Sequence, residues 1–220
     1  MAIDLLGKVP TLGEGEPFPP ATSAKANGLL AIGGTVSPTR LKEALNQGIY
    51  PLCEPGKQTT WWSPNPRAVF ALDNLTISKR RKAKLSALPY LTVANKDVEH
   101  ILLSCAESGQ RRLRGWMSKE LQEVYLQLNK EGLLLSIGVH LEETLVGGIF
   151  GAFVTDKIFT AISMFHRRDQ AGTLALCTLL QELKKRDCTH VDIQKMTDHT
   201  ARFGAYEISQ REYLSLLSLR

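Results

Sequence analysis

The sequence predicts an α+β fold with a mainly antiparallel central sheet, joined to a small N-terminal domain. Three apolar segments, at residues 133–140, 144–153 and 157–165, follow one another with only short charged turns between them, which is typical of an antiparallel meander. An amphipathic helix is expected next, over residues 172–186, and then a further strand over residues 188–193. A chain of 220 residues is long enough to bury a medium-sized core and a small second one.

The N-terminal part is rich in proline, glycine and small polar residues. PFPPATSAKANG, residues 17–28, cannot form a regular helix, because proline lacks a backbone N–H and fixes its own φ. A short apolar strand is expected over residues 29–34. A helix should begin after Ser37, a preferred N-cap residue, with Pro38 in its first turn, and end at Gly48. The aromatic, proline-rich segment that follows is interpreted as a loop leading into a strand.

The remaining elements are assigned from apolar spacing and from turn residues. The helix over residues 118–131 carries its apolar side chains on one face, at helical spacing. The other expected elements are a strand at 68–71, a very basic helix at 78–86, a strand at 91–95, a helix at 98–106, a short helix at 197–203 and closing segments at 206–208 and 213–217. We expect a small N-terminal domain over residues 1–66 and a larger domain over residues 67–220.

Composition and charge indicate which partners, cellular location and metal content to expect of this protein. The formal net charge of +5 favours a polyanionic partner, because cations that contact phosphates release counterions, although a mildly basic protein without such a partner is the alternative. No signal-like segment opens the chain and no apolar run reaches the roughly 18 residues of a membrane span, so we expect a cytoplasmic protein. The 4 cysteines and 5 histidines show no metal-ligand spacing, so we expect reduced thiols and no metal.

The order of elements resembles the acyltransferase fold of the GNAT type, in which an antiparallel centre is followed by a helix and a further strand. Acyl-CoA enzymes of that fold usually carry a glycine-rich pyrophosphate loop before the central helix. Residues 166–172, HRRDQAG, are a poor version of that loop, so an acyl-CoA enzyme is the less favoured interpretation.

Several motifs together resemble those of the leucyl/phenylalanyl-tRNA–protein transferase family. They lie in the family's order and at its spacings between about residues 17 and 217, and WWSPNPR and DHTARFGA are the most specific. The motifs are NGLLAIGGTVSPTRL from Asn27, GIYP from Gly48, WWSPNPRAV from Trp61, LVGGIFG from Leu145, SMF from Ser163, VDIQ from Val191 and DHTARFGAYEISQREYL from Asp198.

The resemblance implies an aminoacyltransferase with a GNAT-like catalytic domain. Such an enzyme forms a peptide bond between an apolar amino acid, leucine or phenylalanine, carried by a charged tRNA, and the N-terminal amine of a protein that begins with arginine or lysine. The added residue marks that protein for degradation in the N-degron pathway. Aminoacyl-tRNA is then the co-substrate, and no other cofactor is required. We expect a monomer, because no apolar stripe is left unexplained.

The reaction centre is expected on the strand VDIQ. An aminoacyl ester is already activated and an α-amino group has a pKa of about 7.7–8.0, so orientation and oxyanion stabilisation can supply most of the acceleration. Asp192 and Gln194 occupy alternate strand positions and should point to one face. The resemblance implies that both are catalytic, with Asp192 orienting Gln194. The alternative is a partly exposed strand with two polar residues.

The donor side chain needs an apolar pocket, and the resemblance assigns seven residues to it. Three of them, Leu176, Leu179 and Leu183, share one helix face at spacings of three and four residues. Such a face is equally typical of a close-packed core without a pocket. The seven residues are Ile149, Phe159, Met164, Leu176, Leu179, Leu183 and Val191.

Binding of the tRNA is expected from one aromatic residue and from basic clusters. Trp116 matches a family residue that stacks on the terminal adenine, although a lone tryptophan is also typical of core packing. Arg167 and Arg168 follow the pocket strand and are expected near the 3′ end. The basic clusters comprise Lys79, Arg80, Arg81, Lys82 and Lys84 on one helix, and Arg111, Arg112 and Arg114 before the tryptophan. For His199 we expect a structural hydrogen bond rather than a role as a base.

The acceptor side departs from the family pattern. Ile162, next to Ser163, stands where the family has a glutamate. Apart from the acceptor side, Leu52 stands where the family has a second adenine-stacking tryptophan, and Leu45 where a tyrosine is usual. Losing a carboxylate weakens the case for a cationic acceptor, because a cation needs a charge partner. One alternative is therefore a repurposed paralogue that transfers the aminoacyl group to a small-molecule or peptide amine in a biosynthetic pathway. Another alternative is a non-catalytic protein that binds tRNA or peptide.

Overall fold

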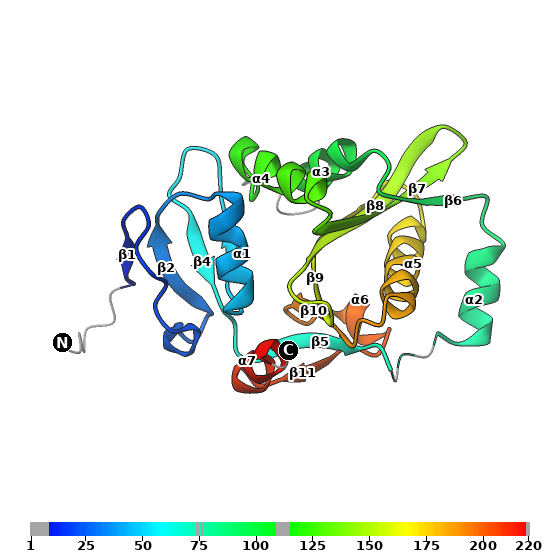
Figure 1. Ribbon diagram of the computed structural model, residues 1–220. Helices are drawn as coiled ribbons and strands as arrows, with labels where there is room; N and C mark the ends of the chain where they lie inside the picture. Colours follow the sequence, from blue (N-terminus) through cyan, green and yellow to red (C-terminus); the bar gives the residue numbers. More distant parts are fainter. Residues whose placement is uncertain (1–8, 74, 76, 109–114, 219–220) are drawn as a thin grey trace.

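The computed structural model describes residues 9–73, 75, 77–108 and 115–218 (Figure 1). The chain forms two sheets. A four-stranded sheet has the order β1-β2-β4-β3, and a seven-stranded sheet has the order β11-β5-β10-β9-β8-β7-β6. The small sheet and α1 lie at one end of the molecule, and the large sheet fills the remainder (Figure 1).

The small sheet contains β1 (Thr11–Leu12), β2 (Leu29–Gly33), β3 (Tyr50–Leu52) and β4 (Thr60–Trp62). Helix α1 (Pro38–Asn46) begins as expected, because Ser37 Oγ accepts a hydrogen bond from the Arg40 N–H at 3.1 Å. The expectation of a continuous loop after this helix is wrong, because β3 and β4 lie within it. Pro51 hid β3 in the sequence, but β3 is an edge strand, where a missing N–H is tolerated.

The large sheet contains the expected meander. Its strands are β5 (Arg67–Ala71), β6 (Leu91–Ala94), β7 (Leu134–Leu141), β8 (Thr144–Phe153), β9 (Ile158–His166), β10 (His190–Gln194) and β11 (Tyr206–Ile208). Every neighbouring pair in this sheet is antiparallel except β9 and β10, which are parallel. The prediction of an α+β fold with a mainly antiparallel centre is therefore confirmed.

Helices cover both faces of the large sheet. Helix α5 (Ala171–Lys185) packs on one face, where it shares a core with Leu135, Ile137 and Val139 of β7. Helices α3 (Val98–Glu107) and α4 (Lys119–Lys130) pack on the other face. The remaining helices are α2 (Lys79–Ser86), the short α6 (Asp198–Ala201) and α7 (Gln210–Ser218), besides one 3-10 turn η1 (Ala21–Ser23).

The two sheets share part of their core. Leu41, Leu45 and Cys53 of the N-terminal part pack in the same cluster as α3 and α4. The division into residues 1–66 and 67–220 falls between β4 and β5, and it stays a prediction. None of the four cysteines forms a disulfide within the described residues, and all four are buried. Among the described helices, none is both long and apolar enough to cross a membrane.

Strands β9 and β10 diverge part of the way along the sheet. Their pairing runs from His190 opposite Ile158 to Asp192 opposite Thr160. Beyond this point β9 continues to His166, paired with β8. Each strand also has a bulge just past the last pair, with Ile162 as the extra residue of β9 and Ile193 as that of β10. A bulge re-aims side chains and ends pairing, so the sheet opens at this place.

Candidate active site

A buried carboxylate, Asp192, lies where β9 and β10 separate. Its Oδ1 accepts hydrogen bonds from Arg67 Nε and from the Gln194 backbone N–H, both at 2.8 Å. Its Oδ2 accepts from Arg67 Nη2 at 2.6 Å, from Thr160 Oγ1 at 3.0 Å and from the Tyr213 hydroxyl at 3.2 Å. Five donors thus converge on two oxygens, an arrangement that suits an ionised carboxylate, which only accepts.

The environment of Asp192 keeps it away from any substrate. The side chains of Asp192 and Arg67 are 0% and 1% exposed. Burial works to lower the pKa of Arg67, but the adjacent Asp192 carboxylate outweighs it and raises this pKa above its usual value. Burial, helped by Asp192, also raises the pKa of Tyr213. Asp192 can therefore position other groups, but it does not itself reach a reacting atom.

Asp192 positions Gln194 by accepting a hydrogen bond from its backbone N–H. The Lys195 N–H donates to the Ile193 carbonyl at 2.7 Å, which closes a three-residue turn around Gln194, whose φ is 65°. This is the γ-turn geometry that non-glycine residues rarely adopt. The hydrogen bond from the Gln194 N–H to Asp192 holds the strained turn. The extra residue Ile193 breaks the strict alternation that we expected along this strand.

The Gln194 side chain is half-buried at the opening of the sheet. Among the described residues, its amide has no hydrogen-bond partner, so both its donor and its acceptor are available to a ligand. The neighbouring Lys195 places its Nζ 5.5 Å from the centre of the Trp62 ring, so the N-terminal sheet borders the same opening.

Sequence reasoning missed Arg67, Thr160 and Tyr213 as members of this site. Arg67 was the one of these three that the sequence could have indicated. It opens the strand RAVFA, whose first four residues are all buried. A charge inside a buried strand needs a partner of opposite charge. Nothing in the local pattern pointed to Thr160 or Tyr213, which approach Asp192 from β9 and α7.

The seven residues assigned to the donor pocket lie together, but most of them form close-packed core. Six of them are at most 3% exposed and belong to the cluster between α5 and the sheet: Ile149, Phe159, Leu176, Leu179, Leu183 and Val191. Met164, on β9, is half-buried, and it alone of the seven lines one of the cavities described below. Met164 is therefore the residue of this set that a ligand in those cavities can contact.

Two adjoining cavities form a basic groove next to Met164. The first has a volume of about 590 Å³ and is lined by Arg80, Arg81, Lys84 and Arg202 among others. The second has a volume of about 750 Å³ and is lined by Met164, His166, Arg167, Arg168 and the first turn of α5, with Asp169 as the acidic member. The two cavities share three lining residues, Gln170, Thr173 and His199. We call the pair the basic groove and the shared part its neck.

The structure places the expected tRNA-binding residues differently. Arg80, Arg81 and Lys84 line the basic groove, whereas Lys79 and Lys82 are exposed on the same helix outside that lining. Trp116 is 5% exposed in the core and its Nε1 donates to the Cys105 carbonyl at 3.3 Å, so it takes the core-packing alternative. The residues of the second cluster, Arg111, Arg112 and Arg114, lie outside the described part of the chain.

His199 does not make the structural hydrogen bond that we expected. Its Nε2 is buried without a partner, and no described residue pairs with Nδ1. The ring instead packs on Phe203, with centroids 5.0 Å apart. Burial lowers the pKa of His199, and His166, Arg202 and Arg81 lower it further by charge repulsion. The imidazole is thus a neutral group inside a basic groove.

The altered acceptor side is apolar. Ile162 is the bulged residue of β9 and is half-buried, and Ser163 beside it pairs with Phe150. Ile162 packs against the same core cluster as Leu52 and Trp62. No group of three or more His, Cys, Asp or Glu side chains among the described residues is arranged to hold a metal ion.

Comparisons with known proteins match this chain to one family. The family model for leucyl/phenylalanyl-tRNA protein transferase matches residues 69–218. A protein of that name from Christiangramia forsetii is 35% identical over 204 residues, which cover 92% of this chain and 96% of that protein. Another from Shigella dysenteriae serotype 1 is 37% identical over 202 residues, which cover 92% and 85%.

A solved structure supports the expected GNAT-like fold. The crystal structure of FemX aligns with a TM-score of 0.51 at 12% sequence identity, over 80% of this chain and 70% of that one. The family model covers the strands that carry Asp192, Gln194 and Met164, together with the basic helix and α7. The chain therefore belongs to the leucyl/phenylalanyl-tRNA–protein transferase family.

Proposed function

We propose that this protein transfers leucine or phenylalanine from a charged tRNA to the N-terminal amine of an acceptor protein. The family membership supports the reaction, and the basic groove is the structural feature that carries it. The groove runs from the cations of α2 to Met164 on β9, the residue of the expected donor pocket that lines it. It thus joins a surface suited to phosphates to the place where an apolar side chain can enter.

The reaction is aminolysis of an ester. The acceptor nitrogen attacks the ester carbonyl and forms the new N–C bond, the bond from the carbonyl carbon to the ribose oxygen breaks, and this oxygen takes up the proton that the amine loses. Gln194 is placed to orient the amine with its amide oxygen or to stabilise the developing oxyanion with its amide N–H. Asp192 keeps Gln194 in its strained turn. Asp192 is thus a positioning residue in this mechanism.

The 3′ end of the tRNA binds along the basic groove. Arg80, Arg81 and Lys84 contact phosphates in the first cavity, and Arg167 and Arg168 do so in the second. Helix α5 begins at the second cavity without a side-chain cap, so the N–H groups of its first turn add to the attraction for an anion.

One observation favours a second candidate for the acceptor. Ile162 leaves an apolar surface where the family carries a carboxylate, and it packs against the same core cluster as Leu52 and Trp62. An apolar surface does not balance the positive charge of an N-terminal arginine or lysine. The second candidate is therefore transfer from the same charged tRNA to an amine without that charge, in a peptide or a small molecule.

The test is transfer of radiolabelled leucine from Leu-tRNA to two peptides, one beginning with arginine and one beginning with alanine. Transfer to the arginine peptide alone supports the first candidate. Transfer to the alanine peptide at an equal or higher rate supports the second. A third result, tRNA binding without transfer to either peptide or to a panel of small amines, would make the chain a non-catalytic binder. The matched control is Gln194→Ala in a single-turnover assay, because it leaves the buried Arg67–Asp192 pair intact. A binder keeps its tRNA affinity with it, whereas an enzyme loses rate.

We also propose that the protein works in the cytoplasm and as a monomer. Charged tRNA, the proposed donor, is made in the cytoplasm. Sedimentation of the free protein tests the monomer, and a dimer at micromolar concentration would contradict it.

A further inference from the structure

The neck of the basic groove differs chemically from its two ends. Arg80, Arg81 and Lys84 stand on one side, and Arg167 and Arg168 on the other. The neck itself is lined by Gln170, Thr173 and His199, which carry hydrogen-bonding groups but no formal charge when the imidazole is neutral. A ligand that fits the whole groove is therefore anionic at two places and neutral and polar between them.

His199 lines the neck without a hydrogen-bond partner among the described residues. Its Nε2 has no hydrogen bond and no described residue pairs with Nδ1, although the ring is half-buried. The ring packs on Phe203, with centroids 5.0 Å apart. Because Nε2 is buried, a ligand in the groove can reach the ring only at Nδ1, and a hydrogen bond there would be gained without breaking one inside the protein.

The spacing of charge along the groove matches a nucleic-acid strand better than it matches a nucleobase. In a strand, the phosphates alternate with sugars, as the cations here alternate with neutral groups. A stacked base would need an open aromatic face, but Phe203 is 9% exposed. Arg81 covers it at 4.2 Å from the ring centroid, and His199 packs on it as well. The neck therefore suits a sugar.

We propose that the neck recognises a ribose 2′-hydroxyl of the tRNA 3′ end, with His199 as the residue that hydrogen-bonds to it. The hydroxyl is both a donor and an acceptor, so it can pair with Nδ1 of a neutral imidazole in either tautomer, and it is the group that distinguishes RNA from DNA. Thr173 lines the neck beside His199 and is a second candidate partner for the same sugar. This inference rests on the proposed function, because it requires that RNA occupies the groove.

The experiment measures binding of two ligands, an uncharged tRNA and the same tRNA with 2′-deoxynucleotides in its single-stranded 3′ end. We expect the wild-type protein to bind the first about three- to tenfold more tightly, the effect of one hydrogen bond. His199→Leu should remove most of this preference, and His199→Gln, which keeps a hydrogen-bonding group, should restore part of it. Circular dichroism melting identifies any variant that does not fold.

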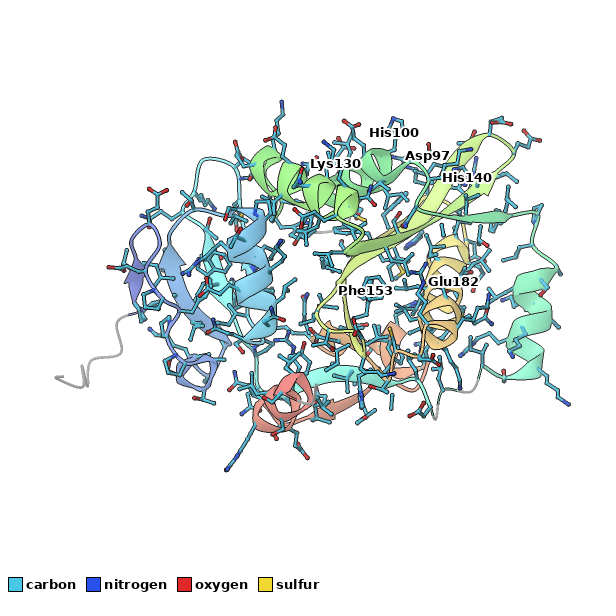
Figure 2. The ribbon with its side chains drawn as sticks, in the orientation of Figure 1. Asp97, His100, Lys130, His140, Phe153 and Glu182 are labelled. Atoms are coloured by element: carbon cyan, nitrogen blue, oxygen red, sulfur yellow. The ribbon has the colours of Figure 1, made fainter. Side chains whose placement is uncertain are left out.

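Two control variants separate the hydroxyl from charge and from general effects. Arg168→Ala should weaken binding of both ligands equally and lower the salt dependence by about one phosphate, leaving the preference intact. His100→Leu changes an exposed histidine on α3, outside both cavity linings, and should change neither value (Figure 2).

Three results would overturn the inference, and they differ from failure of the proposed function. The wild-type protein could bind both ligands equally. His199→Leu could keep the full preference, which would place the hydroxyl contact elsewhere. His199→Leu could weaken both ligands by the same factor, which would assign the ring to a base or a phosphate. If the wild-type protein binds no tRNA at all, the proposed function itself is wrong and the inference falls with it.

Discussion

Arg67 and Asp192 form a bidentate ion pair inside the protein, with Nε to Oδ1 at 2.8 Å and Nη2 to Oδ2 at 2.6 Å. The pair ties the first strand of the large sheet to the strand of the reaction centre. Arg67 Nη1 also donates to the Gly48 carbonyl at 3.0 Å, so the same guanidinium reaches the N-terminal part. The site is therefore held by contacts far apart in the sequence.

Arg67→Leu should strongly destabilise the protein. Removing one partner of a buried ion pair leaves the other charge uncompensated, which costs about 3–5 kcal/mol. Arg67→Lys keeps the charge but loses the bidentate geometry, and should cost less. Urea unfolding measures both. The Arg67→Leu and Asp192→Leu double variant should be more stable than Arg67→Leu alone, and equal or lower stability would contradict the pairing.

Gln194 should act through its side chain, and two variants can separate this from its strained backbone. Gln194→Ala and Gln194→Gly both remove the amide, but glycine adopts the φ of 65° without the roughly 1–2 kcal/mol that other residues pay. We expect both variants to lose about 10²–10³ in kcat, the effect of removing one transition-state hydrogen bond. The glycine variant should unfold at the same or a higher urea concentration. Full activity in the glycine variant would exclude a catalytic side chain.

Sequence and structure agree on the elements of the large sheet and its helices, but they differ on the N-terminal strands β3 and β4 and on the side chains that complete the site. The meander and the α5 helix were predictable, because their apolar periods of two and 3.6 residues follow from burying one face. Arg67, Thr160 and Tyr213 were not, because they meet Asp192 through tertiary packing from three separate elements. The turn at Gln194 was also hidden, since a bulge is an insertion relative to a partner strand and leaves no mark in a single sequence.

Trp116 and His199 both differ from what the sequence predicted for them, in opposite ways. Trp116 was expected to face a ligand but is packed in the core, whereas His199 was expected to be tied into the structure but has no hydrogen-bond partner among the described residues. Residue type predicts what a side chain is able to contact. The contact that it makes depends on neighbours that the local pattern does not contain.

Met164 and Leu179 should respond differently to truncation. Leu179 is fully buried, so Leu179→Ala should cost about 2–5 kcal/mol of stability by leaving a cavity. Met164 is half-buried at the groove, so Met164→Ala should cost less and should instead admit a larger donor. We expect it to raise kcat/KM for Phe-tRNA relative to Leu-tRNA by about tenfold, a typical effect of pocket volume. An unchanged ratio would place the donor side chain elsewhere.

Stability should fall in mild acid, and His199 should account for part of the loss. Burial first, and then His166, Arg202 and Arg81, lower the pKa of His199 below the ordinary value of 6.5. The unfolded chain therefore binds a proton at a higher pH than the folded one does. The stabilisation is complete above 6.5 and is lost as the pH falls from 6.5 toward the folded pKa.

Urea unfolding over this pH range measures how steeply the free energy of unfolding depends on pH. Burial also lowers the pKa of His190, so the wild-type slope contains both residues. His199→Gln should flatten it in part, and the effect should shrink at high salt, which screens Arg81 and Arg202. His190→Gln is the matched control, because its pKa shift has no arginine among its causes and its share should depend less on salt. A His199→Gln protein with the full wild-type slope would show that this histidine is protonated equally in both states.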